Sequence, residues 1–175
     1  MPLVLTYRGP LPAVNDRNKR NTEKQIIRRS LHEQIVNGPK KRYMMLAEHS
    51  ELWRPRKIRN FSFHALICKN PFFPRRGCDL EIKILSNDPF GALYQKGDLD
   101  NRLKTLFDAL CLPNKDQLPA NDYPKERESP LWVLLADDSL ITDLHIIQNS
   151  LHLPVEQKNY VELTISVSIK DEYRV

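Results

Sequence analysis

The segment 97–110, GDLDNRLKTLFDAL, constrains the fold more than any other part of the chain. Its apolar residues Leu103, Leu106, Phe107 and Leu110 recur at the spacing i, i+3, i+4 and i+7, which places them on one face of an α-helix. Such a stripe is stable only when another element covers it. We therefore expect a helix that begins at about Asn101, with Asp100 as its N-cap, packed on a sheet.

The partner sheet is predicted from two kinds of apolar pattern. Residues 80–85 (LEIKIL) and 159–169 alternate apolar and polar side chains, as half-buried strands do. Further strands are expected at 3–7, 61–69, 131–138 and 144–153, and a turn-rich connection suggests that 61–85 forms a long antiparallel pair.

The remaining chain predicts helices and one long loop. Ile27, Leu31 and Ile35 recur every four residues, which favours a helix from Asn21 or Thr22 to about Val36. A shorter helix is expected over 41–53, and 111–130, with four prolines and no periodicity, is interpreted as a surface loop inserted into the fold. The order of elements indicates an α+β protein with a small mixed or antiparallel sheet packed with helices. Its 175 residues fit one domain.

Charge divides the chain into two parts. Residues 1–76 contain 17 Lys and Arg against 5 Asp and Glu, whereas residues 77–175 contain 10 against 17. Clustered cations with aromatic neighbours are typical of surfaces that bind phosphate backbones, although basic runs also occur on unrelated solvated surfaces. The residues predicted to bind nucleic acid are Arg17, Lys19, Arg20, Lys40, Lys41, Arg42, Arg54, Arg56, Lys57, Arg59, Arg75, Arg76 and Lys96.

Two acid pairs are the candidate chemical site. Asp98 and Asp100 precede the helix, and alternate residues of an extended segment face the same side, so both can face one cation. Asp137 and Asp138 end the apolar stretch at 131–136, where ionised carboxylates need an explanation. If the amino end of the helix approaches this strand end, the two pairs converge on a site suited to Mg²⁺.

The helix also carries a candidate catalytic lysine. Lys104 lies one turn after Asp100 and is placed to stabilise charge on a phosphate. A structural interpretation stays open for each residue, because Asp100 can act as a plain cap and Lys104 as a solvated side chain. Asp108 lies four residues after Lys104 and is interpreted as its structural ion-pair partner.

Together these residues resemble a known family. Asp98, Asp100, Asn101, Lys104, Asp108, Ala109 and Leu110, followed by Asp137, Asp138, Ser139 and Ile141, are similar to the two motifs of RusA-type Holliday junction resolvases. In that family the late acids follow the helix after a short turn, whereas here residues 111–136 intervene.

The resemblance implies a RusA-like α+β fold, a symmetric homodimer, and nicking of four-way DNA junctions that depends on Mg²⁺ or Mn²⁺. It implies metal-binding roles for Asp98, Asp100 and Asp138, with Asp137 beside them, and a catalytic role for Lys104. The alternatives are a nucleic-acid-binding protein with a degenerate site, or a nuclease that acts on other DNA or RNA structures.

Other residue types indicate an ordinary cytoplasmic protein. Cys68, Cys78 and Cys111 form no CxxC pair, so reduced thiols are expected, and the five histidines show no zinc spacing. The start of the chain lacks a basic segment followed by a long apolar one, and no apolar run approaches the length of a membrane span.

Overall fold

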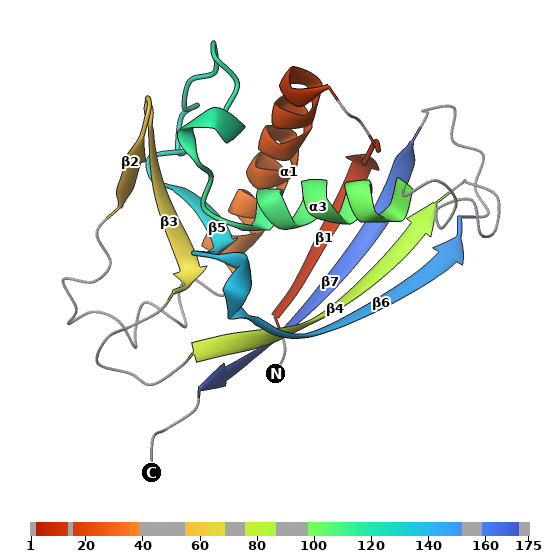
Figure 1. The fold of residues 1–175 in the computed structure, drawn as a ribbon. Helices are drawn as coiled ribbons and strands as arrows, with labels where there is room; N and C mark the ends of the chain where they lie inside the picture. The colour runs from red at the N-terminus through yellow and green to blue at the C-terminus, as the bar shows by residue number, and fades with distance from the viewer. Residues whose placement is uncertain are drawn as a thin grey trace.

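A computed structural model describes residues 3–13, 16–38, 55–68, 76–86, 98–151 and 159–171, and Figure 1 shows their arrangement. Within these ranges the chain forms two α-helices and two mixed β-sheets. The expected α+β class is therefore confirmed. The expected helix over 41–53 lies outside the described residues.

The larger sheet has four strands in the order β1-β7-β4-β6. They are β1 (Leu3–Pro10), β7 (Tyr160–Asp171), β4 (Arg76–Ser86) and β6 (Ile141–Ser150). Strand β7 is antiparallel to β1 and to β4, whereas β4 and β6 are parallel. One face of this sheet carries the main core, because buried apolar residues alternate along β4 and β7 as the sequence predicted.

The smaller sheet has three strands in the order β2-β3-β5. They are β2 (Arg56–Ile58), β3 (Phe61–Ile67) and β5 (Leu131–Leu135); β2 is antiparallel to β3, and β3 is parallel to β5. The expected antiparallel pair across 61–85 is therefore wrong. Phe61 and Phe63 of β3 pack in a second core cluster with Leu131, whereas β4 buries its apolar face in the main core.

Helix α1 (Arg17–Asn37) begins earlier than predicted. The Asp16 side chain accepts hydrogen bonds from the amides of Asn18 and Lys19, so this residue, and neither Asn21 nor Thr22, is the N-cap. The helix packs against β1 on one side and β5 on the other, which joins the two sheets (Figure 1).

Helix α3 (Asp98–Leu110) confirms the apolar stripe. Leu106 and Leu110 are fully buried, and Leu103 and Phe107 pack at the edge of the main core. The expectation that Asp100 is the N-cap is wrong, because residues 98–100 are already helical.

The segment 111–130 contains one short 3₁₀ helix, η3 (Lys115–Gln117), and no α-helix or strand. It lies at the surface as predicted, but hydrogen bonds tie it to α1. The Asn21 side chain donates to the carbonyl of Asp116, and Arg28 donates to the carbonyl of Gln117. This insertion is therefore a fixed part of the fold.

Candidate metal centre and nucleic-acid interface

The first acid pair lies in the opening turn of α3. Asp100 is exposed, and the side chain of Asp98 is outside what the structure describes. Residues i and i+2 of a helix do not face each other, so the helical backbone removes the extended geometry that the sequence interpretation assumed. Negative charge in a first helical turn is favourable in its own right, because it faces the positive end of the helix dipole.

Lys104 lies one helical turn after Asp100 and is exposed. The two side chains therefore share one side of α3, as the spacing predicted. Asp108 has a structural role, but the prediction that it pairs with Lys104 is wrong. Its carboxylate lies 2.6 Å from the ammonium nitrogen of Lys24, which is buried on α1. This ion pair joins the two helices.

The second acid pair follows β5 directly. The Asp137 side chain accepts a hydrogen bond of 2.9 Å from the amide of Ser139 and so caps a short 3₁₀ helix, η4 (Asp138–Leu140). Both Asp137 and Asp138 are exposed. Two solvated carboxylates at the end of a fully buried strand can interact with a cation without the cost of burial.

Asp137 and Asp138 lie beside the carboxyl end of α3. Cys111, the first residue after the helix, forms a parallel bridge with Leu135, and the Leu112 amide donates to the Leu135 carbonyl. Burial, together with the negative charges of Asp138 and Asp137, raises the pKa of the Cys111 thiol to about 12. The second acid pair therefore lies close to this cysteine.

The amino end of α3 lies elsewhere. From Asp100 to Leu110 the helix axis rises about 15 Å, and Figure 1 shows η4 beneath the carboxyl end of the helix. Among the described side chains, no group of three or more His, Cys, Asp and Glu is arranged to hold a metal ion. Within one subunit the structure thus keeps Asp100 apart from Asp137 and Asp138, against the expected convergence.

Several predicted nucleic-acid-binding residues make contacts within the protein. Arg17 pairs with Asp116 at 3.2 Å, and Arg59 donates to the carbonyls of Leu118 and Pro119. Lys19, Arg56 and Lys57 are exposed, and Arg20 is half-buried. Lys40, Lys41, Arg42, Arg54, Arg75 and Lys96 lie outside the described residues, as does the side chain of Arg76.

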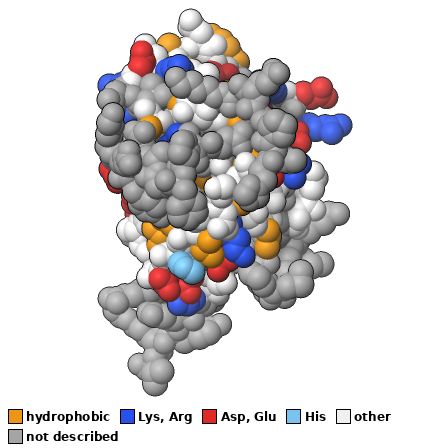
Figure 2. All heavy atoms as spheres, turned by 90° about the vertical axis from the view of Figure 1, so that its right-hand side faces the viewer, with side chains coloured by type: hydrophobic (Ala, Val, Ile, Leu, Met, Phe, Trp, Pro, Cys, Tyr) orange, Lys and Arg blue, Asp and Glu red, His pale blue; other side chains and the backbone are white. Residues whose placement is uncertain are grey.

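Two further arginines of α1 are structural. Arg28 is 1% exposed and donates to the carbonyl of Asp108 at 2.7 Å. Arg29 holds Glu128 and Asp122 of the insertion, each at 2.9 Å. Figure 2 shows basic, acidic and hydrophobic side chains intermixed on one face of the molecule, so the described part of this face carries no single sign of charge.

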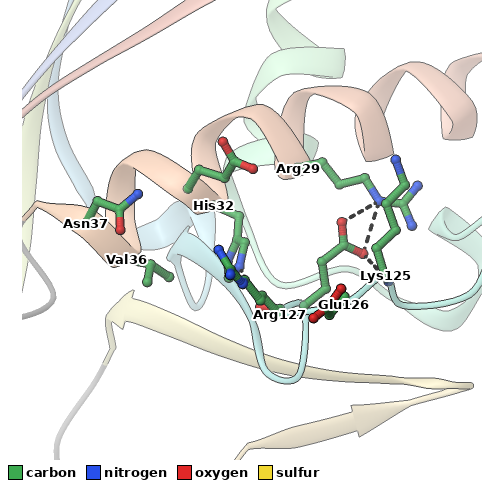
Figure 3. A pocket seen from close by; sticks show the side chains of 9 residues that line it. Arg29, His32, Val36, Asn37, Lys125, Glu126 and Arg127 are labelled. Atoms are coloured by element: carbon green, nitrogen blue, oxygen red, sulfur yellow. Dashed lines mark hydrogen bonds and ion pairs between the residues drawn. The ribbon is translucent and has the colours of Figure 1, made fainter.

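A hollow of about 370 Å³ lies between α1 and the insertion, and sequence reasoning missed it. Figure 3 shows His32 and Arg29 on the helix facing Lys125, Glu126 and Arg127 on the loop. Lys24, Arg28 and His32 follow one another at four-residue intervals on one side of α1. From that spacing one could have predicted that another part of the chain packs on a polar face of α1.

Two hydrogen bonds define the tautomer of His32 at this contact. Its Nδ1 accepts from the Trp132 amide at 2.9 Å, so the ring proton is on Nε2, which donates to the Arg127 carbonyl at 3.1 Å. Both bonds are used to hold the insertion and the start of β5. Because His32, Arg29 and Glu128 of its lining are engaged in contacts between α1, the insertion and β5, we assign the hollow a structural role.

Comparisons with known proteins add no family to these observations: no protein-family model and no curated protein matches the chain. In the part of the chain that the structure describes, no helix combines the length and the apolar character that crossing a membrane requires.

Proposed function

We propose that the chain is a divalent-metal-dependent endonuclease that nicks branched DNA, four-way junctions above all, and that it acts as a homodimer with a RusA-like fold. The observation that carries the proposal is the combination of two acid pairs with one lysine. Asp98, Asp100 and Lys104 lie within the first two turns of one helix, and Asp137 and Asp138 are exposed at the end of a buried strand.

The donor chemistry supports Mg²⁺ or Mn²⁺. These ions prefer oxygen ligands, and Mg²⁺ is commonly held by one or two carboxylates together with substrate phosphates. When bound, such an ion polarises the scissile phosphate and activates water. Asp98 and Asp100 would hold it, and the exposed ammonium of Lys104 would lie over the same phosphate and stabilise its negative charge.

The separation along α3 determines how Asp138 takes part. Asp100 and Asp138 lie near opposite ends of the helix in one subunit, so a site that uses both would draw them from two subunits. A symmetric dimer forms two such sites, each with Asp98, Asp100 and Lys104 from one copy and Asp138 from the other. Two equivalent sites suit a substrate in which two strands are cut.

Cleavage of a labelled four-way junction in Mg²⁺ tests the proposal. Wild-type protein is expected to nick it, whereas Asp100→Asn should lose nicking and still shift the junction in a gel run with EDTA. Asp116→Asn is the matched control, because Asp116 is also an exposed carboxylate but lies in η3. Full cleavage by Asp100→Asn, or none by the wild type on junction, flap, duplex and single-stranded substrates, contradicts the proposal.

A second candidate is a nucleic-acid-binding protein with a degenerate site. It is favoured by the finding that Asp100, Asp137 and Asp138 do not meet within the described part of one subunit. The discriminating measurement is thermal unfolding with increasing Mn²⁺, because a ligand of the folded state must raise the melting temperature. Retained, salt-sensitive DNA binding with no such rise favours this second function.

A further inference from the structure

The two edges of the four-stranded sheet differ in how they are protected. An unpaired edge strand presents free amides and carbonyls that pair readily with another strand. At the β1 edge, the Gln34 side chain bonds both the amide and the carbonyl of Thr6, at 2.9 and 2.6 Å, and the strand ends at Pro10. A glutamine and a proline therefore block pairing along β1.

The β6 edge has no such protection among the described residues. β6 is ten residues long, contains no proline, lysine or arginine, and pairs with β4 on one side only. Its ionisable residues are Asp143 and His145, and Leu144 is 39% exposed, one of a few large apolar side chains that are so open. A long edge strand that lacks proline and lysine and exposes a large apolar side chain is the type that associates.

From this contrast we propose that β6 pairs antiparallel with β6 of a second copy, which extends the sheet continuously across the dimer. Two-fold symmetry places the same strand on both sides, so the two free edges satisfy each other's hydrogen bonds. The partner is a second copy of this chain, because β6 is self-complementary when two copies pair antiparallel. The residues that oppose each other in the register show this.

The pairing with β4 determines which part of β6 is available. A bulge opposite Cys78 and Asp79 interrupts the ladder, and the register is regular from Asp143 to Ser150. Antiparallel partners must lie on the same face of the sheet, so an odd-numbered residue must oppose an odd-numbered one and an even-numbered residue an even-numbered one. The two-fold axis of such a pair passes beside the residue that opposes its own copy. When that residue is Ile146, the pairing uses this segment and leaves no charge facing an apolar or like-charged group.

In that register each residue meets a compatible one. Ile146 opposes Ile146 of the partner subunit, and Leu144 opposes the partner's Gln148. His145 opposes the partner's Ile147, and the Asp143 carboxylate, an acceptor, opposes the partner's Asn149, whose amide donates. An apolar contact thus lies at the centre, pairs of one apolar and one polar residue flank it, and a polar contact lies at the rim, which agrees with the usual arrangement of interfaces.

The same pairing bears on the proposed nuclease site, and this step rests on the proposed function. Antiparallel pairing brings the partner's Asp138 to the end of the sheet where β6 finishes at Ser150. The amino-terminal half of α3 lies at that end, because Arg102 bonds Asn159 at 3.4 Å, next to the start of β7, which pairs with Ser86 of β4. The dimer therefore moves the partner's acids toward Asp98 and Asp100.

Cysteine cross-linking tests the interface without using nuclease activity. Ile146→Cys should form a disulfide dimer on mild oxidation, because opposed residues lie within the Cα separation that a disulfide requires. Leu144→Cys alone should not, since its copies lie four residues apart along the ladder. A mixture of Leu144→Cys and Gln148→Cys should give the heterodimer, and wild-type protein reports background from the native cysteines.

Sedimentation equilibrium supplies an independent readout. Ile146→Lys places two ammonium groups face to face at the two-fold axis and should weaken the dimer at least tenfold, whereas Val4→Lys on β1 should leave it intact. A monomeric wild type, or cross-linking that is equal at 144 and 146, overturns the interface. A dimer that forms as proposed but cuts no DNA leaves the interface standing and removes the nuclease.

Discussion

The ion pair between Lys24 and Asp108 gives the most quantitative prediction for the fold. The Lys24 side chain is 5% exposed and Asp108 is 25% exposed, and their charged atoms lie 2.6 Å apart. Replacing Asp108 by Ala leaves a buried ammonium without its partner, which typically costs about 3–5 kcal/mol. Since water reaches part of Asp108, we expect the lower end of that range.

The expected loss of about 3 kcal/mol corresponds to a fall in melting temperature of about 6–12 °C for a domain of this size. Urea unfolding measures the free energy directly. Asp116→Ala is the matched control, because the pair of Asp116 with Arg17 is exposed on both sides and contributes less than about 1 kcal/mol. The double variant Lys24→Met, Asp108→Leu should recover most of the loss, because an apolar pair replaces the buried charges.

The stabilising role of this pair between α1 and α3 is refuted if Asp108→Ala unfolds at the same urea concentration as Asp116→Ala. It is also refuted if the double variant is no more stable than Asp108→Ala. Either outcome would mean that the contact between the helices does not depend on this pair.

Three further measurements follow from the structure. Burial raises the pKa of Cys111 to about 12 and that of Cys78 to about 11. A thiol reagent at pH 8 should therefore modify half-buried Cys68 first. Fast modification of Cys111, located by mass spectrometry, would contradict this. The hydrogen bond from Lys170 holds the pKa of Asp79 below its usual range, so this pair stabilises the fold above the usual aspartate pKa and the contribution disappears as the pH falls through the lowered value. Carbon NMR titration should show the low pKa, and Lys170→Met should return it toward normal. His32→Phe leaves the Trp132 amide and the Arg127 carbonyl unpaired, at a cost of about 2–4 kcal/mol in urea unfolding; an unchanged midpoint would show that these bonds contribute nothing.

Local patterns predicted local structure well. The apolar stripe of α3 and the alternation of β7 depend on the periodicity of one element, and both are as expected. Errors of a few residues at helix starts have a local cause: Asp16 offers a better cap than Asn21 or Thr22, because its carboxylate reaches two free amides.

Pairing between distant elements was not predictable in the same way. Alternation in β3 and β4 specifies which side chains are buried, but it does not specify which strand lies alongside. The separation of Asp100 from Asp138 has the same origin. The insertion 111–130 allows β5 to start far from the end of α3. The strand then runs back to Cys111, so that Asp137 and Asp138 lie at the carboxyl end of the helix.

The polar contacts of α1 also could not be predicted from the sequence. Arg28 and Arg29 are adjacent in the basic part of the chain, yet they bind carbonyl and carboxylate groups about 80–100 residues away. A basic run in a sequence can thus consist of residues that make contacts inside the protein. Only the tertiary structure distinguishes such a run from a nucleic-acid-binding surface.

Mixing two inactive variants is the most direct test of the central claim, a metal site shared between two copies. Asp100→Asn and Asp138→Asn should each fail to nick a four-way junction in Mg²⁺. After the two are unfolded and refolded together, half of the dimers contain both variants, and each of these has one intact site, so about a quarter of wild-type nicking should return. No recovery, although sedimentation shows that mixed dimers have formed, would contradict the shared site.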